Sequence, residues 1–404
     1  MMLRRDHLRG RLTAIAAAGV LLLVSGRAWA EPAFRVLYTF RGGSDGASPR
    51  SLTIDKADAL YGATALGGGS GCGGSGCGTV FKITPDGKEA VLYAFQGGSD
   101  GSYPLSPLSL DKAGNLYGVT TYGGASDDGT VFELTPGGTK TILHSFAGGV
   151  EGAIPYGGLL LGKTGELYGT TNSGGDHDCN CGTVFKLTKN GKEKILYRFT
   201  GGSDGEHPFA GLVADGSGNL YGITIAGGVG GFGYGNGTIF RIAPDGTHTV
   251  LYSFTDQDAG LEPNSTLIED DAGNLYGTTN TTECRCGGGT VFKLAPNGGG
   301  IDFLYVFAHD SPNGSDPIAI LFANGAGNFY GATFAGGTRV NGRDAGGAIF
   351  TLGADGNEST IYALSPKKDG WGITSLIRGR NGNLYGTALQ RGASGYGTVF
   401  EVTP

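Results

Sequence analysis

The chain has 404 residues, with 36 acidic side chains against 29 basic ones, and a net charge of −7 when the histidines are neutral. An acidic surface repels the phosphates of nucleic acids and of anionic lipids, so we expect neither nucleic-acid binding nor membrane insertion. Glycine contributes 81 residues, far above its usual share. It recurs at fixed offsets beside Tyr, Phe and Leu, which indicates turns in a repetitive fold.

The first 30 residues have the pattern of an export signal. Four arginines within residues 4–11 precede an apolar run over residues 12–24, and Ala28 and Ala30 flank Trp29 before Glu31. The apolar run is too short to span a bilayer, and its flanks are those of a cleaved signal peptide. We therefore expect export to the periplasm or the extracellular space by the general secretory route. The Arg4-Arg5 pair leaves the twin-arginine route as the alternative. Cleavage would lower the net charge to about −11 and leave residues 31–404 as one domain.

Three short phrases recur seven times in the same order along the rest of the chain. A Leu-Tyr-x-Phe-type strand comes first, Leu-Tyr-Gly second and Gly-Thr-Val-Phe third. Successive Leu-Tyr-Gly tyrosines are 51 to 56 residues apart. These tyrosines are Tyr61, Tyr117, Tyr168, Tyr221, Tyr276, Tyr330 and Tyr385. A period near 50 residues with several strands in each unit is typical of a propeller or a solenoid.

One repeat, the fourth, shows how each unit is built. Its pattern predicts four strands, over residues 208–215, 220–224, 238–242 and 250–254. Turns with glycine at positions that favour positive φ separate the first from the second and the third from the fourth. Four short antiparallel strands in about 50 residues make a propeller blade.

The two ends of the repeat region complement each other. Residues 34–40 resemble a fourth strand with no first three before it, and residues 397–403 resemble a third strand with no fourth after it. Pairing of these two segments would close a ring and remove exposed sheet edges. The sequence therefore predicts an all-β, seven-bladed β-propeller of four-stranded antiparallel blades, with the N-terminal strand completing the last blade.

The repeated units also carry a resemblance to a known family. Segments such as residues 271–279 (DAGNLYGTT) and 182–191 (GTVFKLTKNG) resemble the tandem repeat of the choice-of-anchor GloVer-containing proteins. The resemblance extends over residues 34–404. It implies an exported repeat protein of propeller type and supplies no reaction and no catalytic residues. Members of that family commonly carry a C-terminal sorting anchor, which we do not expect here.

Strand order places the variable loops on one face of the ring. The turns after the first and third strands are short and uniform, whereas the loops after the second and fourth strands are long and differ between repeats, so we expect function on the latter face. Six inner strands begin with a proline, and Gly372 is expected in that place in the seventh. Residues just before these positions should surround the mouth of the central channel, and five of them are our ligand-binding candidates: Tyr103, His207, Glu262, Asp316 and Trp371.

All six cysteines lie in the loops between second and third strands: Cys72, Cys77, Cys179, Cys181, Cys284 and Cys286. An even number in an exported protein favours disulfides, and the spacing favours pairing within each loop. Metal binding is the less favoured alternative, which His177 supports in one loop. Residues 256–262 have alternating oxygen side chains, as in a Ca²⁺ loop, but a solvated turn is the better interpretation.

Aromatic rings and scattered carboxylates at one opening suit a sugar, and a solvated rim without ligand is the competing interpretation. Candidate general acids and bases are His207, Glu262, Asp316 and His309, and no spacing marks a catalytic pair. We therefore expect a monomeric, non-catalytic module that binds a glycan or a protein on the variable face, with no cofactor and no bound metal. The alternatives are a polysaccharide lyase or glycoside hydrolase at the channel mouth, and a purely structural surface protein.

Overall fold

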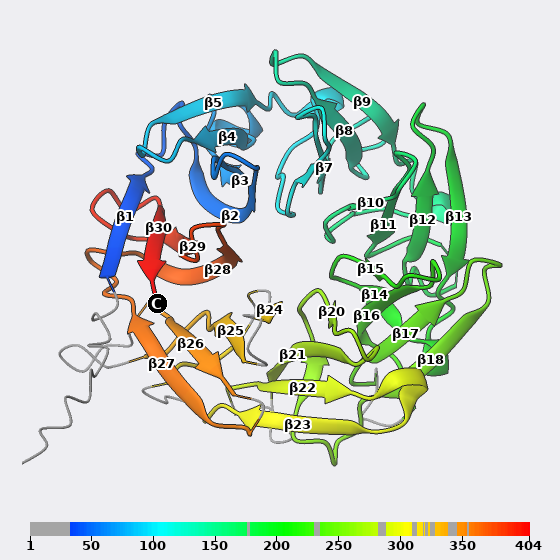
Figure 1. The fold of residues 1–404 in the computed structure, drawn as a ribbon. Helices are drawn as coiled ribbons and strands as arrows, with labels where there is room; N and C mark the ends of the chain where they lie inside the picture. Colours follow the sequence, from blue (N-terminus) through cyan, green and yellow to red (C-terminus); the bar gives the residue numbers. More distant parts are fainter. Residues whose placement is uncertain are drawn as a thin grey trace, which may run out of the picture. The chain divides into compact units, whose positions relative to one another are not determined.

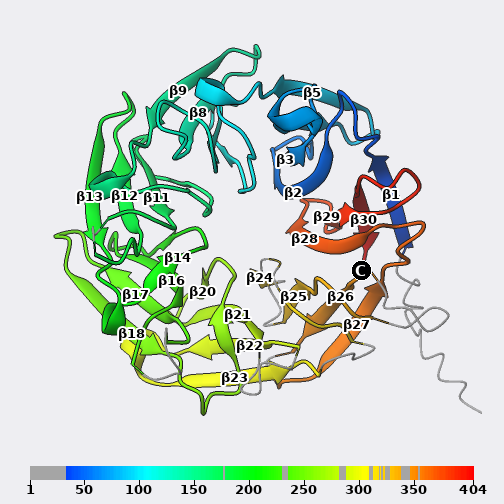
Figure 2. The same cartoon turned by 180° about the vertical axis from the view of Figure 1, so that it is seen from behind.

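A computed structural model describes residues 33–175, 178–229, 235–281, 288–308, 313–317, 319, 322–323, 328–337, 346–353 and 355–404. The predicted export signal, residues 1–30, lies outside the described residues. Chain contacts separate two units, Met1–Glu31 and Pro32–Pro404. Seven antiparallel sheets of the second unit follow one another around a ring (Figure 1), and the same order is visible from behind (Figure 2). The seven-bladed β-propeller predicted from the repeats is confirmed.

The first four blades have these strands in chain order. Blade 1 contains β2 (Ala47–Ile54), β3 (Leu60–Leu66), β4 (Thr79–Ile83) and β5 (Glu89–Ala94). Blade 2 contains β6 (Ser109–Leu110), β7 (Leu116–Thr120), β8 (Thr130–Leu134) and β9 (Lys140–Ser145). Blade 3 contains β10 (Leu160–Leu161), β11 (Leu167–Thr171), β12 (Thr183–Leu187) and β13 (Glu193–Arg198). Blade 4 contains β14 (Glu206–Pro208), β15 (Val213–Ala214), β16 (Leu220–Ala226), β17 (Thr238–Ile242) and β18 (His248–Ser253).

The last three blades repeat this order, and short 3₁₀ turns lie between strands. Blade 5 contains β19 (Leu261–Pro263), β20 (Ile268–Glu269), β21 (Leu275–Thr281), β22 (Thr290–Leu294) and β23 (Ile301–Val306). Blade 6 contains β24 (Phe322–Ala323), β25 (Phe329–Ala332), β26 (Ala348–Leu352) and β27 (Glu358–Ala363). Blade 7 contains β28 (Trp371–Arg378), β29 (Leu384–Gln390), β30 (Thr398–Thr403) and β1 (Ala33–Thr39). The 3₁₀ turns are η1 (Cys72–Gly74), η2 (Gly98–Asp100), η3 (Gly149–Glu151), η4 (Gly202–Asp204) and η5 (Pro296–Gly298).

The ring closes through the N-terminal strand, as predicted. Strand β1 pairs antiparallel with β30, with Phe34 opposite Val402 and Thr39 opposite Thr398. Phe34 also stacks on Tyr362 of blade 6, with ring centroids 4.2 Å apart. The last blade therefore has four paired strands, and its outer edge is covered by a segment more than 350 residues away in sequence.

The repeated Gly and Phe form one packing unit in each blade. Gly62 of β3 lies opposite Phe81 of β4 in the strand register, and a Cβ on Gly62 would come within 2.5 Å of the Phe81 ring. Phe81 in turn meets Phe40 of the preceding blade edge to face, at 5.1 Å between centroids. The glycine is therefore needed because a ring from the paired strand lies directly against it.

The expectation for the inner strand of blade 4 needs correction. In blade 4 the predicted strand over residues 208–215 is interrupted, with pairing at β14 and β15 only. Pro208 lacks the N–H that a ladder needs, and His207 before it has φ of 57°. In the turn before β21 of blade 5, Asp270 accepts hydrogen bonds from the backbone N–H groups of Ala272 and Asn274.

Within the part of the chain that the structure describes, no helix is long and apolar enough to span a membrane.

Candidate ligand-binding site at the channel mouth

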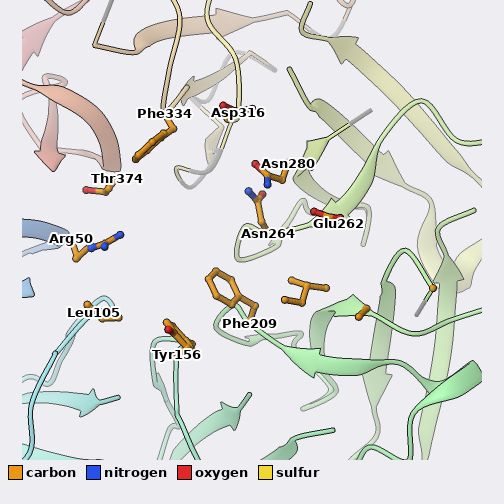
Figure 3. A pocket seen from close by; sticks show the side chains of 13 residues that line it. Arg50, Leu105, Tyr156, Phe209, Glu262, Asn264, Asn280, Asp316, Phe334 and Thr374 are labelled. Atoms are coloured by element: carbon orange, nitrogen blue, oxygen red, sulfur yellow. The ribbon is translucent and has the colours of Figure 1, made fainter. Parts of the chain in front are cut away.

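A cavity of about 880 Å³ lies where the inner strands begin (Figure 3). All seven blades contribute to its lining, which mixes aromatic, aliphatic, amide and charged groups. The lining residues are Arg50, Leu105, Tyr156, Phe209, Ile225, Ala226, Gly235, Glu262, Asn264, Asn280, Asp316, Phe334 and Thr374. These residues lie at the starts of first strands and the ends of second strands, so the cavity belongs to the variable-loop face.

Six of the thirteen lining residues occupy one equivalent position, directly after the inner-strand proline or its counterpart. This set is Arg50, Leu105, Tyr156, Phe209 and Asn264, with Thr374 after Ile373 in blade 7. The counterpart in blade 6, Ile318, lies outside the described residues. In blades 1 and 7 the strand register shifts at this residue, between Pro49 and Ser51 and between Ile373 and Ser375. Such a bulge re-aims a side chain, and here Arg50 and Thr374 face the cavity.

Two of the five predicted candidates, Glu262 and Asp316, line the cavity. Tyr103 and His207 are not among the lining residues. Tyr103 packs edge to face on Tyr122 at 5.8 Å, and the Nδ1 atom of His207 lies 3.0 Å from the backbone oxygen of Asn172. These four candidates, all directly before a proline, have φ of 56–57°. Each backbone N–H bonds to a carbonyl in the preceding blade: Tyr103 to Cys77, His207 to Cys181, Glu262 to Asn236 and Asp316 to Gly288. The position before the proline is therefore a point where neighbouring blades are joined.

Trp371 occupies a different register from the one predicted. It lies opposite Gln390, as Ala47 lies opposite Leu66, and Ile373 rather than Gly372 takes the place of the proline. Gly372, with φ of 77°, is the true counterpart of the residue before the proline. Trp371 therefore lies one position too early for the rim, and it packs edge to face against Phe334, which lines the cavity, at 4.8 Å.

The charged lining residue on the aromatic side is Arg50. Its Nε atom is buried and has no hydrogen-bond partner, and none of the ion pairs among the described residues includes it. Burial lowers the pKa of the Arg50 guanidinium, and the neighbouring Tyr156 phenol opposes that shift. Burial also raises the pKa of Tyr156. A partly buried cation without a counter-ion favours an anionic group as ligand.

Aromatic rings and amides share the middle of the cavity. Phe209 is 36% exposed and stacks on Tyr156, with centroids 5.0 Å apart and planes at 27°. In Figure 3 the Phe209 ring and the amides of Asn264 and Asn280 project toward the centre. The amide oxygen of Asn264 accepts a hydrogen bond from Thr278 at 3.1 Å, which orients that side chain. The cavity thus offers a flat apolar surface beside hydrogen-bonding groups.

The cysteine predictions on the described residues are confirmed. Disulfides join Cys72 to Cys77 and Cys179 to Cys181, and the described residues contain no free cysteine. The third predicted pair, Cys284 and Cys286, lies outside the described residues, as do His177 and His309. Cys77 and Cys181 also provide the backbone oxygens that hold Tyr103 and His207.

The segment considered as a Ca²⁺ loop has a structural role. Asp258 accepts hydrogen bonds from the Tyr252 hydroxyl at 2.6 Å and from the backbone N–H of Thr255. Asp256 accepts one from the amide of Asn236 at 2.9 Å. Because these carboxylates are occupied by the protein itself, the turn interpretation is the one the structure supports.

Comparison with solved structures gives the same fold at low identity. A streptogramin B lyase matches 93% of this chain and 99% of its own, at 12% identity and a TM-score of 0.61. Virginiamycin B lyase from Staphylococcus aureus matches 93% and 99%, at 15% identity and a TM-score of 0.60. An extracellular domain of a B. thetaiotaomicron hybrid two-component system matches 92% of this chain and 41% of its own, at 14% identity and a TM-score of 0.56. At such identities the likeness shows the fold alone.

Comparison of the sequence with known families identifies the repeat. No curated protein matches the chain. The Gloeobacter/Verrucomicrobia repeat matches residues 27–234 and 179–400, which together include nearly all of the propeller. The chain therefore belongs to the Gloeobacter/Verrucomicrobia (GloVer) repeat family.

Proposed function

We propose that this protein is an exported binding module that holds an acidic glycan in the cavity at the channel mouth. The observation that carries the proposal is Arg50, a partly buried guanidinium that has no counter-ion among the described residues, at the edge of an aromatic-lined cavity. The volume of about 880 Å³ is within the ~300–1,000 Å³ usual for small-molecule sites.

The lining matches the chemistry of a sugar acid. Phe209 and Tyr156 offer ring faces for the apolar face of a pyranose. The carboxylate of a uronic acid would pair with Arg50, and hydroxyl groups would donate to Glu262 and Asp316 on other blades. In Figure 3 Arg50 and Glu262 lie on opposite sides of the cavity, so a ligand with one carboxylate and several hydroxyls can satisfy both.

Export is part of the same proposal. The two disulfides suit an oxidising compartment, and the N-terminal 30 residues have the pattern of a signal peptide. The B. thetaiotaomicron relative in fold is an extracellular domain. Periplasmic or extracellular polysaccharides would be accessible to such a protein.

A glycan array with neutral and uronate-containing oligosaccharides, followed by calorimetric titration, tests the proposal. Phe209→Ala should weaken binding by about 2 kcal/mol, close to 30-fold, because an exposed aromatic anchor is removed. Arg50→Gln should abolish the preference for acidic over neutral sugars. Asp86→Asn, in a turn after a third strand on the opposite face, is the matched control and should bind like the wild type. Binding that survives both cavity substitutions but is lost in the control would contradict the proposed site.

A lyase or hydrolase on the same cavity is the second candidate, because the two carboxylates of Glu262 and Asp316 line it. The described lining has no histidine beside these two carboxylates, because the Nδ1 atom of His207 lies against the backbone oxygen of Asn172 instead. Incubation of each bound glycan with the protein and analysis of the products separates the candidates. Turnover that Glu262→Gln or Asp316→Asn removes, with binding retained, would replace the binding module with an enzyme.

A further inference from the structure

A second polar cluster lies between blades 2 and 3, away from the cavity. At most blade boundaries the fourth-strand Tyr hydroxyl donates to an Asp in the following loop, at 2.6–2.9 Å. These pairs are Tyr38–Asp45, Tyr93–Asp100, Tyr197–Asp204, Tyr252–Asp258 and Tyr362–Asp369. At the boundary between blades 2 and 3 both partners differ, because His144 replaces the Tyr and Glu151 replaces the Asp.

The next blade contributes a third group to this boundary. Glu193 is the first residue of β13, and its counterpart at the preceding boundary is Lys140, the first residue of β9. Lys140 is almost fully buried and pairs with Asp100 at 2.7 Å, above the rings of Tyr93 and Phe95. At the His144 boundary a carboxylate takes the place of that ammonium group, so two glutamates face a histidine without a neighbouring lysine.

The three side chains converge on one small volume. One potential ligand atom from each of His144, Glu151 and Glu193 lies within 4.8 Å of the others, and the Nε2 atom of His144 is 3.6 Å from Oε1 of Glu193. The two side chains are only 16% and 10% exposed. Both of these atoms are buried and have no hydrogen-bond partner among the described residues. An unpaired buried carboxylate oxygen is costly, which indicates that something else belongs between these groups.

The surroundings orient these groups toward one another. The His144 ring is fixed edge to face on Phe146 at 4.8 Å. His144 pairs with Val131 beside a register shift in blade 2, and Glu193 pairs with Leu187 in blade 3. The nearby cation Arg198 donates its Nε–H to the backbone oxygen of Val150 at 2.9 Å.

We propose that His144, Glu151 and Glu193 form a binding site for a divalent transition-metal ion, with Zn²⁺ as the best match. One imidazole nitrogen with two carboxylates is a ligand set for Zn²⁺ and its neighbours in the first row, whereas Ca²⁺ and Mg²⁺ prefer oxygen alone. Ligands at ~2.0–2.2 Å from zinc lie roughly 3.5 Å apart, so the three groups need to close by only about 1 Å. The ion would fasten blade 2 to blade 3 at a boundary where the Tyr–Asp pair is missing.

The test uses the mature protein without a histidine tag, titrated with ZnCl₂ by calorimetry and checked by elemental analysis after dialysis. The informative variant is His144→Tyr/Glu151→Asp, which restores the Tyr–Asp pair of the other boundaries and so should keep the fold. Wild type should bind roughly one more equivalent of zinc than this double variant. Zinc should raise the Tm of the wild type and leave the Tm of the double variant unchanged. Glu193→Gln should weaken binding at least tenfold.

His248→Gln is the matched control, since His248 lies at the next boundary, where it stacks on Tyr197 at 4.0 Å. It should bind zinc like the wild type. The proposal is overturned if wild type takes up no zinc at micromolar concentrations, or if the double variant and Glu193→Gln bind as much as wild type. Loss of binding in His248→Gln alone would also overturn it. None of these results depends on whether the central cavity binds a glycan.

Discussion

The glycine of each Leu-Tyr-Gly phrase provides a sharp test of why the repeat has this sequence. Gly222 of β16 lies opposite Phe240 of β17. A Cβ at Gly222 would come within 2.5 Å of the Phe240 ring and 2.9 Å of Leu212. Both side chains are buried, so neither can turn toward solvent. Gly222→Ala therefore forces a ring and a strand apart in the core of blade 4.

The expected loss follows from this overlap. Inserting one methyl group into a well-packed core costs about 1–3 kcal/mol. For a folded unit of roughly 370 residues the entropy of unfolding is about 0.8 kcal/mol/K, so the Tm should fall by about 1–4 °C. Differential scanning calorimetry measures both the shift and the cooperativity. A second substitution, Phe240→Leu, removes the clashing ring, and the double variant should lose less than the two single losses combined.

The matched control is Gly216→Ala in the turn of the same blade. No atom lies within 4 Å of a Cβ at Gly216, and its φ is not positive. The equivalent positions in blades 2 and 5 hold Lys112 and Asp271, so this variant should remain within about 0.5 kcal/mol of wild type. If Gly222→Ala and Gly216→Ala unfold at the same temperature, close contact with the phenylalanine is not the reason for the glycine.

Three further outcomes follow from the fold. Deletion of residues 33–39 should lower the Tm by more than Gly222→Ala does, because it bares the edge of β30; an unchanged thermal transition would contradict ring closure. Non-reducing peptide mass mapping should recover both described disulfides, and reduction should lower the Tm only modestly because the loops are short; scrambled pairs would contradict local pairing. Burial raises the pKa of Asp100, but bonds from Lys140 and Tyr93 outweigh it, so the folded-state pKa lies below the usual value. The stability from this carboxylate is complete above about pH 4 and is lost as the pH falls through the folded-state pKa. Lys140→Ile, which copies Ile301 of β23, should therefore show a smaller loss of Tm on acidification, and an equal loss would refute the pairing.

The fold could be predicted because its determinants are local and repeated. Each Gly opposite a Phe specifies the pairing of the second and third strands, and each Tyr-x-Phe segment specifies the fourth. Even the closure between β1 and β30 follows from this pattern, since each end has one part of a blade that the other lacks. The inner strands were predicted less well because prolines and left-handed residues interrupt their pairing, as at His207 and Pro208.

The cavity lies on the face that was predicted to carry function, and six of its lining residues are two positions further along the chain than the residue before the inner-strand proline or its counterpart. The alternation of side chains in a regular strand gives no warning that a bulge at Arg50 turns that side chain toward the axis. The residue before the proline varies between blades, which made it a candidate. The residue after it varies just as much, from Arg50 to Phe209, and this variation is the signal that could have located the lining. Trp371 was misplaced because blade 7 has no proline to mark the register.

Departures from the repeat are the most informative positions in such a chain. A residue that recurs in most blades, such as the fourth-strand Tyr that bonds to the loop Asp, is explained by packing that every boundary needs. At His144 and Glu151 both partners change together, so the Tyr–Asp bond is absent. Instead, three potential ligand groups of this boundary lie within 4.8 Å of one another. Arg50 is a similar departure from the repeat, because no other described blade has a cation at the equivalent position of the cavity lining. Equivalent blade boundaries of a repeat protein can therefore be compared with one another. Boundaries with an intact Tyr–Asp pair show which contacts the fold needs. A boundary that departs from this pattern is where a bound ligand or ion is the explanation to test.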